Sequence, residues 1–351
     1  MNYIELLKGL DPTQILEFKN YLMEHIVDLI SNKDDNSKII KSVKGERNCP
    51  KCNRKLWKNG LAKNKVQKYI CPYCKKTITE TTGTITYRSK KDFNLWKEII
   101  NNLIDGLSIR RIAKKNKINK ATSFSIRHKI LESLSTYIEN VVLKGEIEAD
   151  EKYISINLKG TKKNKMPRLS KKRTSSAFRG ISHHKVCIVT AIDEYDNLIM
   201  KVTGLGPVTT DMLQRTYKDR IEKESLLITD CKSSYLKFCK DNYLNLTSVK
   251  SGTYQNEQLK NLSDINNIHS QLEVWLCKFR GVSTRHIQEY LNWFSYILMM
   301  KRKYEADILD IKMYKDIIAN DNYIKINDIF TKDFPIDLKV AYSEYNYGIF
   351  A

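Results

Sequence analysis

Two closely spaced cysteine pairs place the strongest constraint on how this chain folds. The sequence CPKC supplies Cys49 and Cys52, and CPYC supplies Cys71 and Cys74. Each pair presents two thiolates on a tight turn, and four thiolates complete the tetrahedral shell of a structural zinc ion. Two pairs argue against a redox role, which needs only one. The pattern predicts a zinc ribbon over residues 45–80, with a hairpin turn at Asn59-Gly60.

The charge of the chain indicates a polyanionic partner. Its 351 residues include 61 Lys and Arg against 40 Asp and Glu, which gives a net charge of +21. Nucleic acid is the first candidate, because each phosphate that a basic side chain neutralises releases counterions. The alternative is a lysine-rich surface without a specific ligand.

Neither an export signal nor a membrane span is predicted. The start, MNYIELLKGLDPTQ, lacks the basic and apolar regions of a signal peptide, and the sequence has no apolar run of about 20 residues. We therefore expect a cytoplasmic protein with no membrane partner. Residues 1–40 are predicted to form an N-terminal helical region, and residues 304–351 a C-terminal tail, both without an assigned function.

Residues 92–137 have the pattern of a helix-turn-helix region. The apolar residues in GLSIRRIAKKNKINKATSFSIRHKIL have the spacing of a short helix, a turn and a second helix. Ser108 is the predicted N-cap of the first helix. The second helix would offer polar side chains to a DNA groove, namely Lys120, Thr122, Ser123 and Arg127. The alternative is an ordinary pair of antiparallel helices.

The segment from 146 to 303 has the pattern of an α/β domain. Short apolar or alternating runs predict strands in GEIEADEKYISI, HKVCIVTAID, NLIMKVTGLG and SLLITD, with helices interleaved later. Asp150 and Asp230 lie at the ends of apolar runs. A carboxylate there is costly unless it is paired or coordinated, so the two aspartates suggest a shared cation. Asp193 also ends an apolar run, but the EYDN that follows predicts a turn and a structural role.

The segment DINNIHSQLEVW, residues 264–275, predicts a helix whose polar stripe faces these aspartates. At about 100° per residue, Ile265, Ile268 and Leu272 share an apolar side. Asn266 and Glu273 fall on another side, with His269 beside them. Asn266 or Glu273 should therefore approach the strand-end aspartates, unless the stripe is only a solvated face.

At this point the chain resembles the acidic-triad transposases of bacterial insertion sequences, in the subgroup with a zinc ribbon and Asn as third residue. The resemblance spans about residues 45–300. It is carried by the two cysteine knuckles and by EADEKYI, RGISHHKVCIVTAID, LLITDCKSSY, NNIHS and GVSTRHIQEYLNWF.

The resemblance implies an RNase H-like mixed sheet flanked by helices, preceded by the zinc ribbon and the helix-turn-helix region. It also implies DNA cleavage and strand transfer with two Mg²⁺ or Mn²⁺ ions, held by Asp150, Asp230 and Asn266. Position 273 departs from the family, which usually has a basic residue there. Glu273 is either an additional carboxylate near the metal or a sign of lost activity.

The basic segment 159–173, KGTKKNKMPRLSKKR, is predicted to contact phosphates beside the active site, the alternative being a solvated loop. Its candidate DNA contacts are Lys162, Lys163, Lys171, Lys172 and Arg173. The expected partners are terminal inverted repeats and target DNA, bound by a homo-oligomer. Two alternative functions stay open: an inactive DNA-binding derivative, and a zinc-ribbon nuclease that only hydrolyses DNA.

Overall fold

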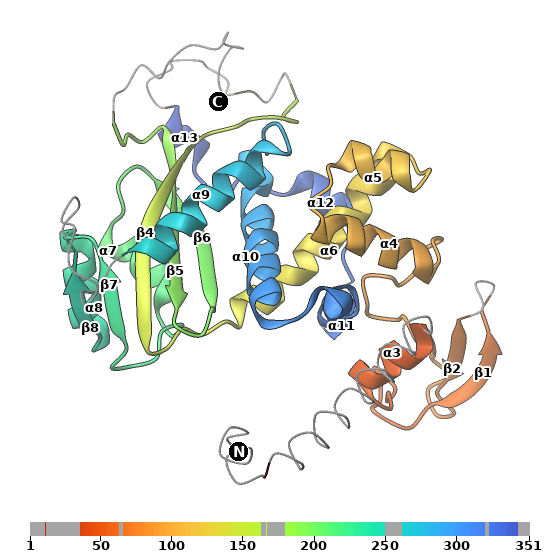
Figure 1. Cartoon of the computed structure of the whole chain (residues 1–351). Coiled ribbons are helices and arrows are strands. Elements are labelled where there is room, and N and C mark those ends of the chain that lie inside the picture. The colour runs from red at the N-terminus through yellow and green to blue at the C-terminus, as the bar shows by residue number, and fades with distance from the viewer. Residues whose placement is uncertain are drawn as a thin grey trace. The chain divides into compact units, whose positions relative to one another are not determined.

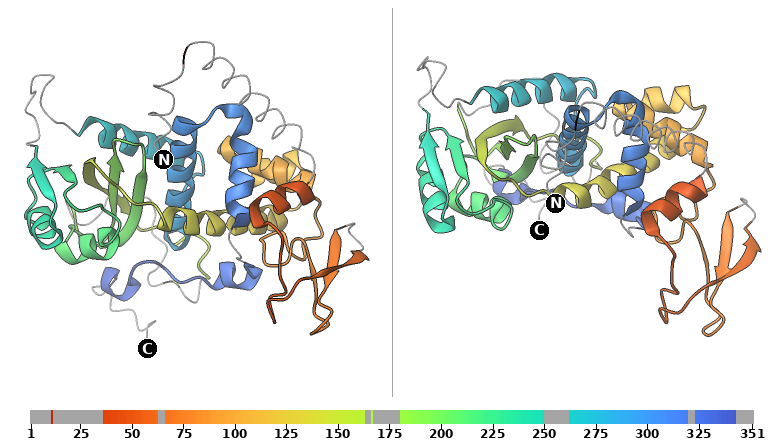
Figure 2. Two further views of the ribbon diagram at one scale, coloured as in Figure 1. Left: turned by 90° about the horizontal axis from the view of Figure 1, so that it is seen from below. Right: turned by 60° about the horizontal axis from the view of Figure 1, so that its bottom comes forward.

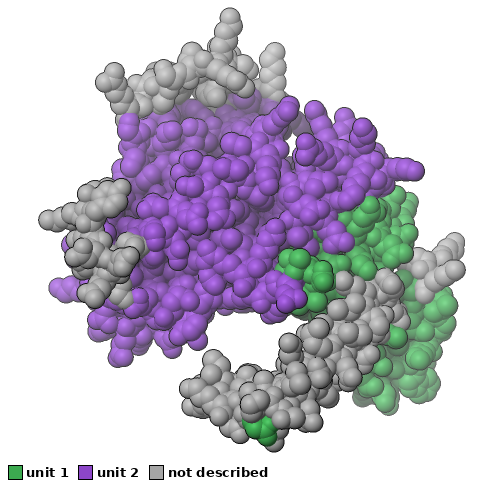
Figure 3. Space-filling view, in the orientation of Figure 1, with its two compact units in different colours: residues 1–100, 306–323 green, residues 101–305, 324–351 purple. Residues whose placement is uncertain are grey.

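The computed structural model describes residues 11, 36–62, 66–162, 166, 180–249, 262–319 and 323–342. Two compact units divide the chain (Figure 3). One comprises residues 1–100 and 306–323, and the other comprises 101–305 and 324–351. Among the described residues, no helix is long and apolar enough to cross a membrane. Most of the predicted N-terminal helical region lies outside the described residues. The first described helix is α3 (Asn36–Lys44).

The first unit contains a three-stranded antiparallel sheet of order β1-β2-β3 (Figure 1). Its strands are β1 (Trp57–Leu61), β2 (Gln67–Ile70) and β3 (Thr77–Thr79). The predicted turn at Asn59-Gly60 is wrong, because both residues lie within β1. The register shifts between Lys58 and Leu61, and Gly60 has φ +63°, so glycine accommodates a bulge in the strand.

Helices complete the first unit. Helix α4 (Phe93–Ile104) buries Trp96, Ile99 and Ile100, and its Phe93 ring meets the Tyr314 ring edge-on. Tyr314 belongs to α11 (Leu309–Ala319), which follows the 3-10 turn η4 (Ala306–Ile308) and packs on α3. The predicted tail is thus not one region, because these helices join the first unit while α12 (Ile326–Thr331) and α13 (Leu338–Ala341) belong to the second.

The predicted pair of helices forms in the second unit. Helix α5 (Ile109–Lys115) begins at Ser108, whose hydroxyl accepts a hydrogen bond from the N–H of Arg111, as predicted for an N-cap. Asn119 caps α6 (Lys120–Glu139) in the same way through the N–H of Thr122. The two helices pack on each other, and α6 also packs along α10 (Ile287–Lys303).

A five-stranded mixed sheet forms the rest of the second unit, with strand order β6-β5-β4-β7-β8 (Figure 1). The strands are β4 (Glu146–Ser155), β5 (Lys185–Asp193), β6 (Leu198–Leu205), β7 (Leu226–Thr229) and β8 (Asn245–Ser248). Strands β4, β5 and β6 are antiparallel neighbours, whereas β7 and β8 run parallel to β4. This is the RNase H-like topology, and it confirms the predicted fold class.

Helices cover both faces of the sheet (Figures 1 and 2). Helices α7 (Thr210–Tyr217) and α8 (Ser233–Asn242) pack on one face, where a continuous apolar core includes Ile147 and Ala149 of β4. Helix α9 (Ser263–Cys277) and α10, preceded by the 3-10 turn η3 (Thr284–His286), contact β4, β5 and β6 on the other face. Because side chains alternate along a strand, Glu148, Asp150 and Lys152 face α9.

Asp193 has the structural role that the sequence predicts. Its carboxylate accepts hydrogen bonds from the N–H groups of Tyr195, Asn197 and Lys144 and from the Asn197 amide. These contacts close the turn between β5 and β6, and they account for an acid at the end of an apolar strand.

Candidate active site

Strand register brings Asp150 and Asp230 together. Glu146, Ile147 and Glu148 of β4 pair in parallel with Leu226, Leu227 and Ile228 of β7. The same register, continued two residues beyond Ile228, places Asp230 beside Asp150. Both aspartates and Glu151 offer ligand atoms within 4.8 Å of one another. The two carboxylates chosen from the sequence therefore converge. Asp230 directly follows β7, as expected, but Asp150 lies within β4 and does not end that strand.

His269 of α9 lies over Asp150. Its Nδ1 is 3.8 Å from Asp150 Oδ2, and its Nε2 is 3.0 Å from the hydroxyl of Thr190, the β5 residue paired with Asp150. Burial, assisted by the positive charge of Lys152, lowers the pKa of His269 to about 4, so the imidazole is neutral at pH 7. Burial also raises the pKa of Asp150 above its ordinary value.

Glu148 fixes the start of α9 over the sheet. Its Oε2 accepts a hydrogen bond of 3.0 Å from the backbone N–H of Ile265, in the first turn of the helix. A carboxylate at this position satisfies a free N–H group and interacts favourably with the positive end of the helix dipole. Ile265, Ile268 and Leu272 are fully buried, as the periodicity of the segment predicts.

Asn266 and Glu273 do not join the carboxylates in this structure. Asn266 is exposed, and among the described residues its amide makes no hydrogen bond to Asp150 or Asp230. Glu273 pairs instead with Lys152, at 2.5 Å, and its side chain is 63% exposed. Lys152 of β4 therefore neutralises Glu273 here, and a metal role for this carboxylate stays a prediction.

A buried acid, Glu151, adjoins the site from the opposite face of β4. Its carboxylate forms an ion pair with Lys232, whose Nζ is also 2.8 Å from Asp230 Oδ2 and 3.9 Å from Asp150 Oδ1. The sequence pattern did not indicate a role for Glu148 or Glu151, and it placed His269 only beside the polar stripe. The alternation of acids in EIEADE was the available signal, but it could not show which acids had partners.

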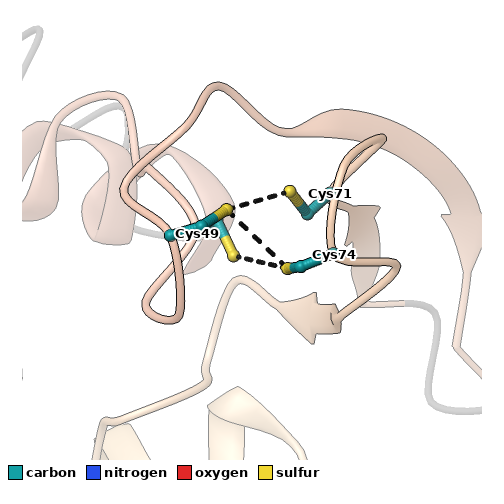
Figure 4. Close-up of side chains that lie close together, drawn as sticks. Cys49, Cys71 and Cys74 are labelled. Carbon is teal, nitrogen blue, oxygen red and sulfur yellow. Dashed lines mark hydrogen bonds between the residues drawn. The ribbon is translucent and has the colours of Figure 1, made fainter.

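The four cysteines form a second candidate metal centre, in the first unit (Figure 4). Cys49 Sγ lies 3.4 Å from Cys74 Sγ, and Cys52 Sγ lies 3.4 Å from Cys71 Sγ. All four sulfur atoms fall within 4.8 Å of one another, which fits the closed thiolate shell of structural zinc. The backbone N–H of Cys74 lowers the pKa of Cys71, against the effect of burial, and this favours the thiolate.

The structure corrects two of the predicted DNA contacts on α6. Ser123 is fully buried, and its hydroxyl donates to the carbonyl of Ile109. Arg127 is 1% exposed, and its guanidinium donates to the carbonyl of Leu107 and the hydroxyl of Tyr290. Both side chains point into the packed interior, where α6 meets α5 and α10, instead of into a groove.

The remaining predicted DNA contacts differ in how far the structure describes them. Lys120 is exposed at the start of α6, Thr122 is partly exposed, and Lys162 is exposed after β4. Lys163, Lys171, Lys172 and Arg173 lie outside the described residues.

Topology and site together define a class: an RNase H-like domain in which Asp150, within β4, lies beside Asp230 at the end of β7. Residues 142–297 match the model of the ISXO2-like transposase domain. The match begins just before β4 and ends within α10, and it includes Asp150, Asp230 and α9.

Relatives and solved structures extend this comparison. An uncharacterized protein in transposable element ISH50 of Halobacterium salinarum is 22% identical over 250 residues, which cover 70% of this chain and 83% of that protein. The Mos1 strand transfer complex has a TM-score of 0.27 at 12% identity, covering 68% of this chain and 82% of that one. The catalytic domain of Mos1 mariner transposase has a TM-score of 0.26 at 13% identity, covering 57% and 93%.

Proposed function

We propose that this chain is a DNA transposase that binds the ends of an insertion sequence and catalyses metal-dependent strand cleavage and strand transfer. The observation that carries the proposal is the parallel register of β4 and β7, which sets Asp150 beside Asp230 within a transposase domain. Carboxylates at this spacing suit divalent ions with oxygen ligands.

Asp150 and Asp230 are the proposed Mg²⁺ or Mn²⁺ ligands. Two such ions, when bound, activate the attacking oxygen and stabilise the leaving oxygen of an in-line displacement. Asn266 stays the proposed third residue, supplied by α9. In this scheme Glu148 holds the start of α9, and the neutral imidazole of His269 orients Asp150 from the same helix.

We assign the proposed DNA-binding and catalytic roles to successive regions of the chain. A zinc ribbon over 45–80 and a helix-turn-helix region over 92–137 would bind terminal inverted repeats, and residues 146–303 would act on the strands. Exposed Lys120, partly exposed Thr122 and exposed Lys162 support DNA contact. A homo-oligomer on DNA would bring the two element ends together.

A strand-transfer assay with labelled element ends tests this function. Asp150→Asn and Asp230→Asn should each abolish Mg²⁺-dependent cleavage while DNA binding stays within about twofold of wild type. Asp211→Asn, an exposed carboxylate on α7, is the matched control and should retain activity.

The products separate the alternatives. Joined products from the wild type support transposition, whereas nicked products without joining indicate a nuclease. DNA binding without cleavage by the wild type indicates an inactive derivative. Cleavage that persists in both aspartate variants contradicts the proposed site.

A further inference from the structure

Lys232 places one ammonium group among three carboxylates. It follows Asp230 by two residues and occupies the N-cap position of α8, without a side-chain hydrogen bond to that helix. Its Nζ forms its closest ion pair with Glu151. The same Nζ lies 2.8 Å from Asp230 Oδ2 and 3.9 Å from Asp150 Oδ1. The space between the proposed metal ligands thus already contains a cation.

Glu151 explains why the ammonium stays there. The Glu151 side chain has no exposed surface, and its Oε1 lies buried without a hydrogen-bond partner. It faces the core between the sheet and helices α7 and α8, where Tyr235 and Tyr217 are fully buried. A buried carboxylate is strongly destabilising unless a cation pairs with it, so Glu151 must retain Lys232.

We propose that Lys232 is the resident counter-cation of the active site, anchored by Glu151, and that a divalent metal must displace it from Asp150 and Asp230. The inference rests on the proposed function, because it assumes that the two aspartates bind the metal. Lys232 is then a positioning residue. It holds the aspartates together before metal binds, and it keeps Glu151 neutralised afterwards, because Glu151 lies on the other face of β4.

Charge repulsion predicts how the loss of Lys232 changes the affinity for the metal. An ammonium and a divalent ion within about 4 Å of each other repel strongly, so the metal must first break the contacts of Lys232 with both aspartates. Removing the ammonium should therefore tighten metal binding. It should also leave Glu151 buried and unpaired, and so lower the stability of the apo protein.

Mn²⁺ titration of the full-length, zinc-containing chain tests the proposal, with free Mn²⁺ measured by electron paramagnetic resonance. Lys232→Met should lower the Kd for Mn²⁺ about tenfold and lower the Tm of the apo protein. The double variant Glu151→Gln, Lys232→Met should recover the Tm and keep the tighter Kd. Lys232→Arg should behave as wild type, and Lys237→Met, an exposed lysine of α8, is the matched control.

Two results would overturn the proposal. If the Kd for Mn²⁺ is unchanged in Lys232→Met, Lys232 does not compete with the metal and its ion pairs have no role in metal binding. A double variant that binds Mn²⁺ more weakly than Lys232→Met makes Glu151 a metal ligand instead of an anchor. The proposed function fails separately: in that case Asp150→Asn leaves the Kd of the wild type and of Lys232→Met unchanged.

Discussion

Replacing Arg127 decides between the DNA contact expected from the sequence and the internal role seen in the structure. Arg127 of α6 donates to the carbonyl of Leu107 and the hydroxyl of Tyr290, and its guanidinium lies over the rings of Trp293 and Phe279, at 5.1 and 5.6 Å. Arg127→Met keeps most of the volume, and it removes these hydrogen bonds and both ring contacts.

The expected loss in the free energy of unfolding follows from those contacts. A hydrogen bond to a charged group contributes about 1.5–3 kcal/mol, and a desolvated cation–π contact contributes about 2 kcal/mol. The lost desolvation cost of the buried charge offsets part of this, since burial already lowers the pKa of Arg127. We expect the free energy of unfolding to fall by about 3 kcal/mol, which lowers the Tm by roughly 6–12 °C in a unit of this size.

Differential scanning calorimetry and a salt titration of DNA binding measure the two roles. Arg127→Met should lower the Tm and leave the slope of log K against log salt unchanged. Lys120→Met, at the exposed start of the same helix, should keep the Tm and reduce the slope by about one. An Arg127→Met protein with wild-type Tm and a reduced slope would refute the internal role.

Three further perturbations test other parts of the structure. If the four cysteines bind zinc as proposed, Cys49→Ser should abolish zinc binding and unfold the surrounding strands, detected by metal analysis and hydrogen exchange; a full zinc content would contradict the four-thiolate centre. Glu273→Gln should change the Kd for Mn²⁺ less than twofold, because this carboxylate pairs with Lys152; a tenfold loss would restore it as a ligand. Hydrogen bonds from His128 and His286 and the charge of Lys332 outweigh burial and depress the pKa of Glu289, so its stabilisation is complete above about pH 5 and is lost as pH falls toward the folded pKa. The difference in Tm between wild type and Glu289→Gln should accordingly be large at pH 7 and shrink at pH 3, and a constant difference would exclude this linkage.

Local sequence pattern was enough to predict most strands of the five-stranded sheet. Alternating or continuous apolar runs predicted β4 to β7, and helical periodicity predicted the buried face of α9. The short polar strand β8, with the sequence NLTS, has no such pattern, and it forms because β7 offers it a parallel edge. The turn predicted at Asn59-Gly60 was wrong because a glycine with positive φ occurs in a strand bulge as well as in a turn, and sequence pattern does not distinguish the two.

Local sequence pattern was enough to select the four cysteines, by their spacing, and Asp150 and Asp230, because each follows an apolar run; it wrongly placed Asp150 at a strand end. The packing of the elements set which polar groups meet. It paired Glu273 with Lys152, buried Arg127 against an aromatic cluster, and joined Glu151 to Lys232. The physical reason is that periodicity fixes the face on which a side chain lies. The partner of a charged group depends on which element packs onto that face, and that element comes from a distant part of the chain.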